Sequence, residues 1–274
     1  MPLYVIPYPV IDPVAFELGP LLVRWYGLAY MFGLLFAWIY VRALLRNTAI
    51  WAGKPPTAPE HADDLLLMIT VGVVVGGRLG SVLFYEPSYY LENPLKIFAV
   101  WEGGMAFHGG LLGVILAVYI FSRWRKTSMM SIADIACASV PVGIFLGRIA
   151  NFINGELYGR VTDVPWAMVF PAGGPFPRHP SQLYEAVLEG LFLFAVGRYL
   201  THWRQGLTRP GLVTGVFFVG YGLARSVSEL FRLPDPEHAL STAYATPGMV
   251  YSLPMILIGA YLIWRASRMR PAAA

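Results

Sequence analysis

The sequence predicts an all-α polytopic membrane protein with about seven transmembrane helices, its N-terminus outside and its C-terminus cytoplasmic. Composition is the first observation: 57% of the 274 residues are hydrophobic and 13% are charged, whereas about a quarter of the residues of a soluble domain are charged. The second is the recurrence of apolar stretches of about 20 residues, each long enough to cross about 30 Å of hydrocarbon as a helix. The third is a series of basic clusters that agree on one orientation.

Apolar stretches of spanning length recur along the whole chain. They lie near residues 21–44, 65–85, 104–122, 131–153, 183–200, 211–231 and 248–265. The segment before the first span has no lysine or arginine ahead of its first acid. It is interrupted by Pro2, Pro7, Pro9 and Pro13. It therefore does not resemble a cleavable signal peptide, and the first span is expected to stay attached.

Basic residues follow the first, third, fifth and last spans. They are Arg42, Arg46 and Lys54, then Arg123, Arg125 and Lys126, then Arg198, Arg204 and Arg209, and finally Arg265, Arg268 and Arg270. By the positive-inside rule these ends are cytoplasmic, so the loops near 86–103, 156–182 and 232–247 are expected outside. This topology accounts for the formal charge of +4. Nucleic acid is excluded as a partner, because no soluble segment is large enough to build a basic face.

We expect one transmembrane domain over residues 1–274, with residues 156–182 inserted as a small extracytoplasmic cap. The cap contains a β-type run, residues 166–170, followed by the turn-rich residues 171–175. No internal repeat is evident, which weighs against transporter folds built from duplicated halves. The single cysteine, Cys137, lies among small apolar residues of the fourth span and is interpreted as a core residue. The sequence has no disulfide framework and no spacing typical of a metal site.

The polar residues within the spans all fall in the outer half of the predicted membrane. They are Arg24 and Tyr26 in the first span, Arg78 in the second, His108 in the third, Arg148 and Asn151 in the fourth, and Arg225 and Glu229 in the sixth. A proton relay or ion path needs groups through the whole thickness of the membrane. One layer of cations instead suits an anionic head group near the outer leaflet.

Two of these spans present arginines on one helical face. Arg148 and Asn151 are three residues apart, and Arg225, Glu229 and Arg232 repeat at i, i+4 and i+7. Arginines from two helices can clamp a phosphodiester and stabilise the charge that gathers on it as a leaving group. The alternative is structural: an Arg–Glu pair that ties the fourth and sixth helices together. Arg148 has no nearby acid in sequence before Glu156.

His108 lies between glycines at the start of the third span, where a ligand can approach closely. A neutral imidazole there can accept a proton from a nucleophile, or it can simply bond a neighbouring helix. Ser181 is expected to N-cap the fifth span, with Gln182 and Glu185 on one side of its first turn; capping does not explain Glu185.

Some of the outer polar residues have simpler explanations. Arg24 and Arg78 can reach the interface as snorkelling side chains. Tyr26 can belong to the interfacial aromatic belt.

Three motifs carry a resemblance to a known family. They are Gly147-Arg148-x-x-Asn151-Phe152-x-Asn154-x-Glu156-x-Tyr158-Gly159, Phe107-His108-Gly109-Gly110 and His179-Pro180-Ser181-Gln182-Leu183-Tyr184-Glu185. Together they closely resemble the prolipoprotein diacylglyceryl transferases, which act in bacterial lipoprotein maturation, and the match covers nearly the whole chain. Ala150 departs from the family, which often has glycine there; another small residue should barely disturb the packing.

The resemblance implies an activity and a set of site residues. The reaction is transfer of the diacylglyceryl group of phosphatidylglycerol to the thiol of the lipobox cysteine in preprolipoprotein signal peptides, with release of glycerol phosphate. The implied location is the bacterial cytoplasmic (inner) membrane, with the site toward the outer leaflet. The catalytic candidates are Arg148, Arg225, His108 and Glu156. The substrate-binding candidates are Tyr26, Asn151, Asn154, Gly159, Glu229, Arg232 and Arg78.

On this interpretation Arg148 and Arg225 hold the phosphate, and Glu229 orients Arg225. The thiol loses its proton either to His108 or because the arginines lower its pKa, and the sequence leaves both routes open. No cofactor and no metal is expected, because displacement at a glycerol carbon requires mainly alignment and stabilisation of the leaving group. Both substrates must enter from lipid, so openings between helices are expected at the outer leaflet.

Two other functions would also place polar residues within the membrane. A small-anion transporter or channel would also use intramembrane arginines, but it needs a path through the inner half of the membrane. The candidates there, Asp63, Asp64 and Asp134, are better explained as acids at helix starts, where the helix dipole favours them. An intramembrane protease would need a serine–histidine or paired-aspartate arrangement at one depth, which the spans lack.

Overall fold

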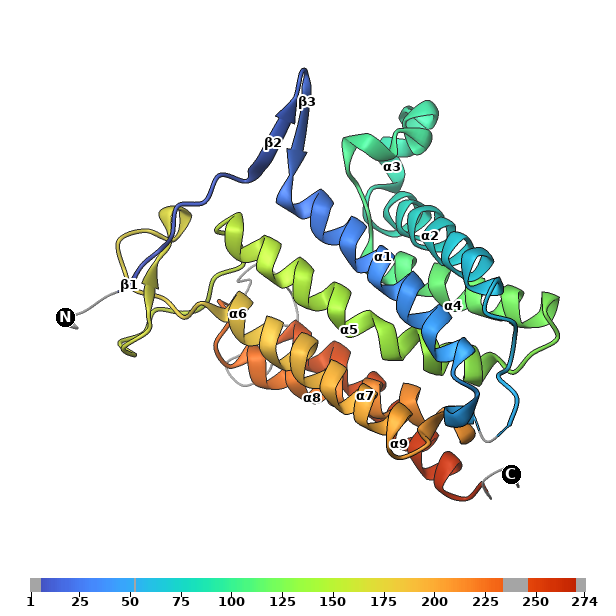
Figure 1. Cartoon of the computed structure of the whole chain (residues 1–274). Coiled ribbons are helices and arrows are strands. Elements are labelled where there is room, and N and C mark those ends of the chain that lie inside the picture. Colours follow the sequence, from blue (N-terminus) through green and yellow to red (C-terminus); the bar gives the residue numbers. More distant parts are fainter. Residues whose placement is uncertain (1–5, 52, 234–245, 270–274) are drawn as a thin grey trace.

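The computed structural model describes residues 6–51, 53–233 and 246–269, and most of them are helical. The helices are α1 (Trp25–Arg46), α2 (His61–Gly80), α3 (Pro87–Glu92), α4 (Phe107–Trp124), α5 (Met129–Ile153), α6 (Ser181–Glu185), α7 (Leu193–His202), α8 (Leu212–Glu229) and α9 (Pro247–Ser267). The strands are β1 (Ile6–Pro7), β2 (Val14–Leu18), β3 (Leu21–Arg24) and β4 (Met168–Val169). Figure 1 shows the long helices side by side.

Within the described residues, five helices are long and apolar enough to cross a membrane. They are Trp25–Arg46, His61–Tyr85, Phe107–Trp124, Met129–Ile153 and Pro247–Ser267. The other two predicted spans are helical as well. One runs from α6 through a π-helical segment, Ala186–Phe192, into α7, and the other is α8, whose polar residues include Arg225 and Glu229. The chain is therefore a polytopic helical membrane protein.

Helix α5 lies at the centre of the helical assembly. It packs against α1 on one side and against α6, α7 and α8 on the other (Figure 1). The closest helix pairs, α2 with α4 and α8 with α9, meet at glycines: a Cβ at Gly76 would lie 2.9 Å from the Cα of Gly113, and one at Gly215 would lie 2.8 Å from the Gly259 carbonyl oxygen. Small residues let helix backbones approach in lipid, where van der Waals packing rather than water exclusion drives association.

The first span begins later than expected, because residues 21–24 form strand β3. Strands β2 and β3 pair antiparallel around Gly19, whose φ is +59°, and the hairpin extends beyond the start of α1 (Figure 1). Arg24 thus lies in an extended strand at the N-cap of α1 and not inside the helix. A Gly-Pro turn between two β-prone runs is the sequence signal for this hairpin.

Residues 156–182 fold as a small segment with little helix. The β-type run expected at 166–170 contains β4, which pairs in parallel with β1 so that Ile6 faces Met168. Arg178 organises the segment: its Nε donates to the Gly173 carbonyl at 2.9 Å, and its guanidinium lies over the Tyr158 ring. The neighbouring loop expected near 232–247 lies largely outside the described residues, as does Arg270.

Two of the three acids near the basic ends of the helices lie at a helix start, as predicted. Asp63 and Asp64 occupy the first turn of α2, where Asp63 pairs with Arg42 at 3.3 Å and Asp64 pairs with Arg125. The prediction is wrong for Asp134, which lies beyond the first turn of α5 and contacts the start of another helix. It is fully buried and accepts hydrogen bonds from the backbone N–H groups of Gly211 and Thr214, at 2.7 and 2.8 Å, and so caps α8 from α5.

The predicted N-cap role of Ser181 is wrong. Pro180 occupies the N-cap of α6, and the Ser181 hydroxyl instead donates to the Leu157 carbonyl at 3.0 Å. The reason is that the chain enters α6 directly from the 156–182 segment, which leaves the Leu157 carbonyl in need of a donor. Ser181 therefore ties the start of α6 to the loop that follows α5.

Candidate active site

Three arginines and three glutamates form one buried ion-pair network between α5, α6, α8 and the π-helical segment 186–192. Glu185 lies at its centre: its carboxylate is 2.9 Å from Arg148, 2.9 Å from Arg225 and 3.0 Å from Arg232. Glu189 lies 3.1 Å from Arg148 and 3.8 Å from Arg225. Glu229 pairs with Arg225 and lies 3.4 Å from Arg232. The arginines predicted from two separate spans thus meet in one site.

Local geometry brings these side chains together. Arg225 and Glu229 lie on one face at the end of α8, as predicted, but the helix ends at Glu229. Arg232 lies beyond it, in an isolated β-bridge with Gly159, and so is not part of a helical stripe. Glu185 ends α6, and Glu189 follows within the π-helical segment. Gly190 allows that segment to approach α5, because a Cβ there would lie 2.9 Å from the Cα of Phe145. π-Helical turns are rare and frequently occur at functional sites.

Arg148 has no acid close to it in sequence before Glu156, but the fold gives it two acidic partners. Both of its terminal nitrogens face carboxylates, and both carboxylates come from the fifth span. The Arg–Glu pairing that we weighed between the fourth and sixth helices therefore exists, but through Glu185 and Glu189. Glu189 was not among the predicted site residues. Its position in an apolar span, four residues after Glu185, marks it as a candidate, because charged residues within spans are rare and commonly functional.

The charges in this network balance. Three arginines face three glutamates, 3 − 3 = 0, and the side chains of Glu185 and Glu189 are 0% exposed. Taking carboxylates out of water costs several kcal/mol each unless partners compensate. The arginines supply that compensation. The arginine side chains themselves stay 16–19% exposed, so the network has an accessible cationic edge.

The loop after α5 carries a second polar group. The side-chain amides of Asn151 and Asn154 donate to the Glu156 carboxylate at 2.8 and 3.2 Å. Gln182 donates to the Glu156 backbone carbonyl at 2.6 Å, which ties this loop to α6. Asn151 lies one turn after Arg148 on α5, and Gln182 lies on α6 with Glu185. The loop and the ion-pair network are therefore parts of one site.

Tyr8 fixes the end of α5 just before this loop. Its hydroxyl lies 2.6 Å from the Phe152 carbonyl and 2.9 Å from the Ile153 carbonyl, so its one proton is shared between two acceptors at the end of the helix. Burial raises the pKa of Tyr8, so the phenol remains protonated and stays a donor at neutral pH. No motif pointed to Tyr8, because the contact spans more than 140 residues of sequence.

Gly159 has a packing role beside the network. Its N–H donates to the His179 carbonyl at 2.9 Å, and it pairs with Arg232 in an isolated β-bridge. A Cβ at Gly159 would lie 2.7 Å from the His179 Cβ and closer still to the Phe231 carbonyl. Only glycine fits there, so the residue sets the distance between the 156–182 segment and the end of α8.

Two candidates lie apart from the network. Arg78 is buried, and its guanidinium donates to backbone carbonyls of the loop before α4, including Ile97 at 2.9 Å and Ala99 at 3.0 Å. This arrangement favours a structural role over the predicted lipid contact. His108 is exposed on the first turn of α4, with its ring edge-on to Tyr251 of α9 at 5.2 Å. On the same turn of α9, Gly248 packs against Glu229.

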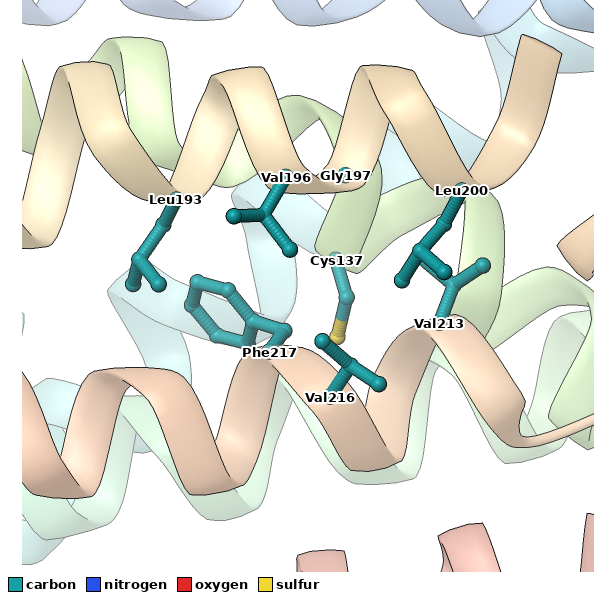
Figure 2. A pocket seen from close by; sticks show the side chains of 8 residues that line it. All are labelled: Cys137, Leu193, Val196, Gly197, Leu200, Val213, Val216 and Phe217. Carbon is teal, nitrogen blue, oxygen red and sulfur yellow. The ribbon is translucent and has the colours of Figure 1, made fainter. Parts of the chain in front are cut away.

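Cys137 lies away from these residues. Its side chain points into a narrow gap between α7 and α8, surrounded by Leu193, Val196, Val213, Val216 and Phe217 (Figure 2). This environment fits the predicted core role. Within residues 6–51, 53–233 and 246–269, no group of three or more His, Cys, Asp or Glu side chains is arranged to hold a metal ion.

Together these features define a polytopic helical membrane protein with a buried arginine–glutamate site at one end of its helices. Comparison with known sequences identifies the family: the profile of the prolipoprotein diacylglyceryl transferases matches residues 13–265. The chain belongs to this family of bacterial membrane transferases.

Individual relatives match along almost their whole length. Proteins named phosphatidylglycerol–prolipoprotein diacylglyceryl transferase from Brucella anthropi, Brucella canis and Brucella ovis are each 53% identical to this chain over 270 residues. Each match covers 98% of this chain and 96% of the relative. The resemblance found in the sequence motifs is thus confirmed.

Proposed function

We propose that this chain transfers the diacylglyceryl group of phosphatidylglycerol to the thiol of the lipobox cysteine in preprolipoprotein signal peptides. The cysteine sulfur forms a thioether bond to the glyceryl carbon, the bond from that carbon to the phosphate oxygen breaks, and glycerol phosphate leaves with the bonding electrons. Family membership supports this reaction, and the names of the relatives contain both substrates. The observation that carries the proposal is the convergence of Arg148 and Arg225 from two helices on one site.

The arginines hold the phosphate and stabilise its departure. Arg148 and Arg225 both contact Glu185, so their guanidinium groups lie close enough to bind one phosphodiester between them. Fixed cations at the leaving oxygen stabilise the charge that develops there, and such electrostatic stabilisation is commonly the largest contribution to catalysis. Glu229 orients Arg225 through their ion pair, and Arg232 adds a third cation at the edge of the site.

Substrate contacts are assigned to the loop after α5. Asn151 and Asn154 fix the Glu156 carboxylate. Tyr26, at the start of α1, is assigned a contact with the head group. Glu156 is exposed and forms no ion pair with a described residue, so it is free to bind hydroxyl groups of the glycerol head group. Gly159 positions this loop against α8.

The thiol proton goes to His108. A thiol with a pKa of about 8.5 is only a few per cent thiolate at pH 7, so a nearby imidazole increases the amount of nucleophile. The position of His108 supports this role. Its ring contacts Tyr251 of α9, and Gly248 near the start of the same helix packs against Glu229 of the ion-pair network. The alternative is that the arginines lower the pKa of the thiol directly. The two routes differ in their pH dependence.

We further propose seven spans in the inner membrane, with the N-terminus outside, the C-terminus cytoplasmic and the site toward the outer leaflet. The helical segments 181–202 and Leu212–Glu229 supply the two spans beyond the five that meet the length and hydropathy criteria. The basic clusters at alternate helix ends support the orientation. Residues 156–182 then form the extracytoplasmic cap over the site.

Reconstitution tests the reaction directly. The purified protein is incorporated into vesicles with phosphatidylglycerol and a lipobox peptide, and the peptide mass is measured. A diacylglyceryl mass gain in the cysteine peptide, and none in a Cys→Ser peptide, is the expected result. No gain with protein shown to be folded would overturn the proposal and favour the anion-transporter alternative, which an anion flux assay in the same vesicles tests.

A further inference from the structure

The arginines proposed to hold the phosphate already have anionic partners. The two terminal nitrogens of Arg148 face Glu185 at 2.9 Å and Glu189 at 3.1 Å. Those of Arg225 face Glu185 at 2.9 Å and Glu229. A phosphodiester that binds end-on, through both terminal nitrogens of an arginine, uses the same donors. In that binding mode the lipid competes with these carboxylates.

Of the three carboxylates, Glu189 is held by the weakest contacts. Glu185 contacts all three arginines within 3.0 Å, and Glu229 pairs closely with Arg225 on its own helix. Glu189 has one contact at 3.1 Å and one at 3.8 Å. It also lies inside the π-helical segment 186–192. A π-turn is less regular than an α-turn, which favours a change of side-chain position there.

The charge of Glu189 affects how strongly the network binds an anion. With all three glutamates in place the network is neutral, so a phosphodiester anion brings the site to a net charge of −1. Without the Glu189 charge, the three arginines face two carboxylates, and the same anion brings the site to zero. In a region of low dielectric, one uncompensated charge weakens binding considerably.

We propose that Glu189 is an internal competitor of the lipid phosphate for Arg148 and Arg225. In the unoccupied site its carboxylate neutralises these arginines, the phosphodiester of phosphatidylglycerol displaces it, and it returns to Arg148 when glycerol phosphate leaves. Glu189 touches no reacting atom, so it is a positioning residue that sets the affinity of the site for anions. The inference rests on the proposed function and specifies how its phosphate site is controlled.

The test is the variant Glu189→Gln, which keeps the side-chain size and removes the charge. Phosphatidylcholine vesicles with graded amounts of phosphatidylglycerol and a fixed lipobox peptide give the KM for the lipid and kcat, and added glycerol phosphate gives product inhibition. The expected result is a KM about fivefold lower or more, with a similar drop in the inhibition constant of glycerol phosphate. An unchanged or higher KM in a folded variant would overturn the inference.

Asp134→Asn is the matched control, because Asp134 is a fully buried carboxylate outside the network. It should lower stability without tightening lipid or product binding. If Asp134→Asn lowers the KM as much as Glu189→Gln does, the effect is general and the inference is wrong.

If Glu189→Gln does not fold, the variant Glu189→Asp tests the inference. Glu189→Asp keeps the charge but withdraws it from Arg148 by about one bond length, so a smaller decrease in KM is expected, and an unchanged or higher KM would overturn the inference. Assays of the wild type distinguish failure of the competitor role from failure of the proposed function. Transfer by the wild type with no gain in affinity in the variants refutes only the competitor role, whereas absence of transfer by the folded wild type refutes the proposed function together with it.

Discussion

Replacing Arg148 with lysine isolates the contribution of its guanidinium fork to the reaction. The change keeps the positive charge that Glu185 and Glu189 require, but an ammonium group cannot bond both carboxylates, or two phosphate oxygens, in the same planar geometry. In the structure the two terminal nitrogens of Arg148 contact these two glutamates at 2.9 and 3.1 Å. The variant should therefore fold and insert while losing part of its activity.

The size of the loss follows from one missing hydrogen bond. A hydrogen bond to a charged group contributes about 1.5–3 kcal/mol, and every 1.4 kcal/mol corresponds to about tenfold. We therefore expect kcat/KM for phosphatidylglycerol to fall roughly 10- to 150-fold. Arg148→Ala should abolish transfer, but it leaves the buried Glu189 with only the 3.8 Å contact to Arg225, and breaking a buried ion pair in this way costs about 3–5 kcal/mol in stability. Lysine is therefore the cleaner test.

The assay is the vesicle reaction with a lipobox peptide, together with a thermal unfolding curve of the protein in detergent. Arg125→Lys is the matched control, because Arg125 forms an ion pair with Asp64 in the first turn of α2, away from the site. The control should keep wild-type turnover. Near-normal turnover of Arg148→Lys would refute the phosphate-clamp role of this arginine.

Three further predictions concern residues in and around the site. His108→Ala should slow transfer most at low pH if the imidazole is the base, whereas a uniform loss across the pH range would favour activation by the arginines; a pH profile of kcat/KM distinguishes them. Asp134→Asn removes a carboxylate that accepts from two backbone N–H groups of α8, so it should cost about 1–3 kcal/mol in the free energy of unfolding, measured as a lower Tm at unchanged KM. Burial lowers the pKa of His179, so the unfolded chain binds this proton more readily and stability should decline as pH falls through the ordinary histidine range; His179→Gln should flatten that part of a curve of Tm against pH.

The membrane class and the approximate helix boundaries followed from composition and the spacing of apolar stretches. The fourth span, expected at 131–153, is observed as Met129–Ile153. The first, expected at 21–44, is observed as Trp25–Arg46. Such stretches are recognisable because a helix must satisfy its own backbone groups in lipid, so length and hydropathy are sufficient evidence. The hairpin before α1 was missed because short strands give a weak signal next to an apolar span.

The partners of the site residues were harder to predict than the residues themselves. Arg148, Arg225 and Glu229 stood out in the sequence as polar residues in apolar spans. The contact of Arg148 with Glu189 joins residues 41 positions apart, and the contacts of Asp134 with the start of α8 join residues 77 and 80 positions apart. Which helix faces meet depends on how closely the helices pack and on their rotation, and one sequence does not fix these quantities.

Hydropathy is a local property of the chain, so the sequence alone was enough to predict a polytopic helical membrane protein, and its motifs were enough to indicate the diacylglyceryl transferase family. The packing of the helices was needed to show that Arg148, Arg225 and Arg232 converge on Glu185, and that Glu189 contacts Arg148 and Arg225. The physical reason is that a buried charge is stable only beside a partner, and here the partners come from different helices, brought together by close packing at residues such as Gly190.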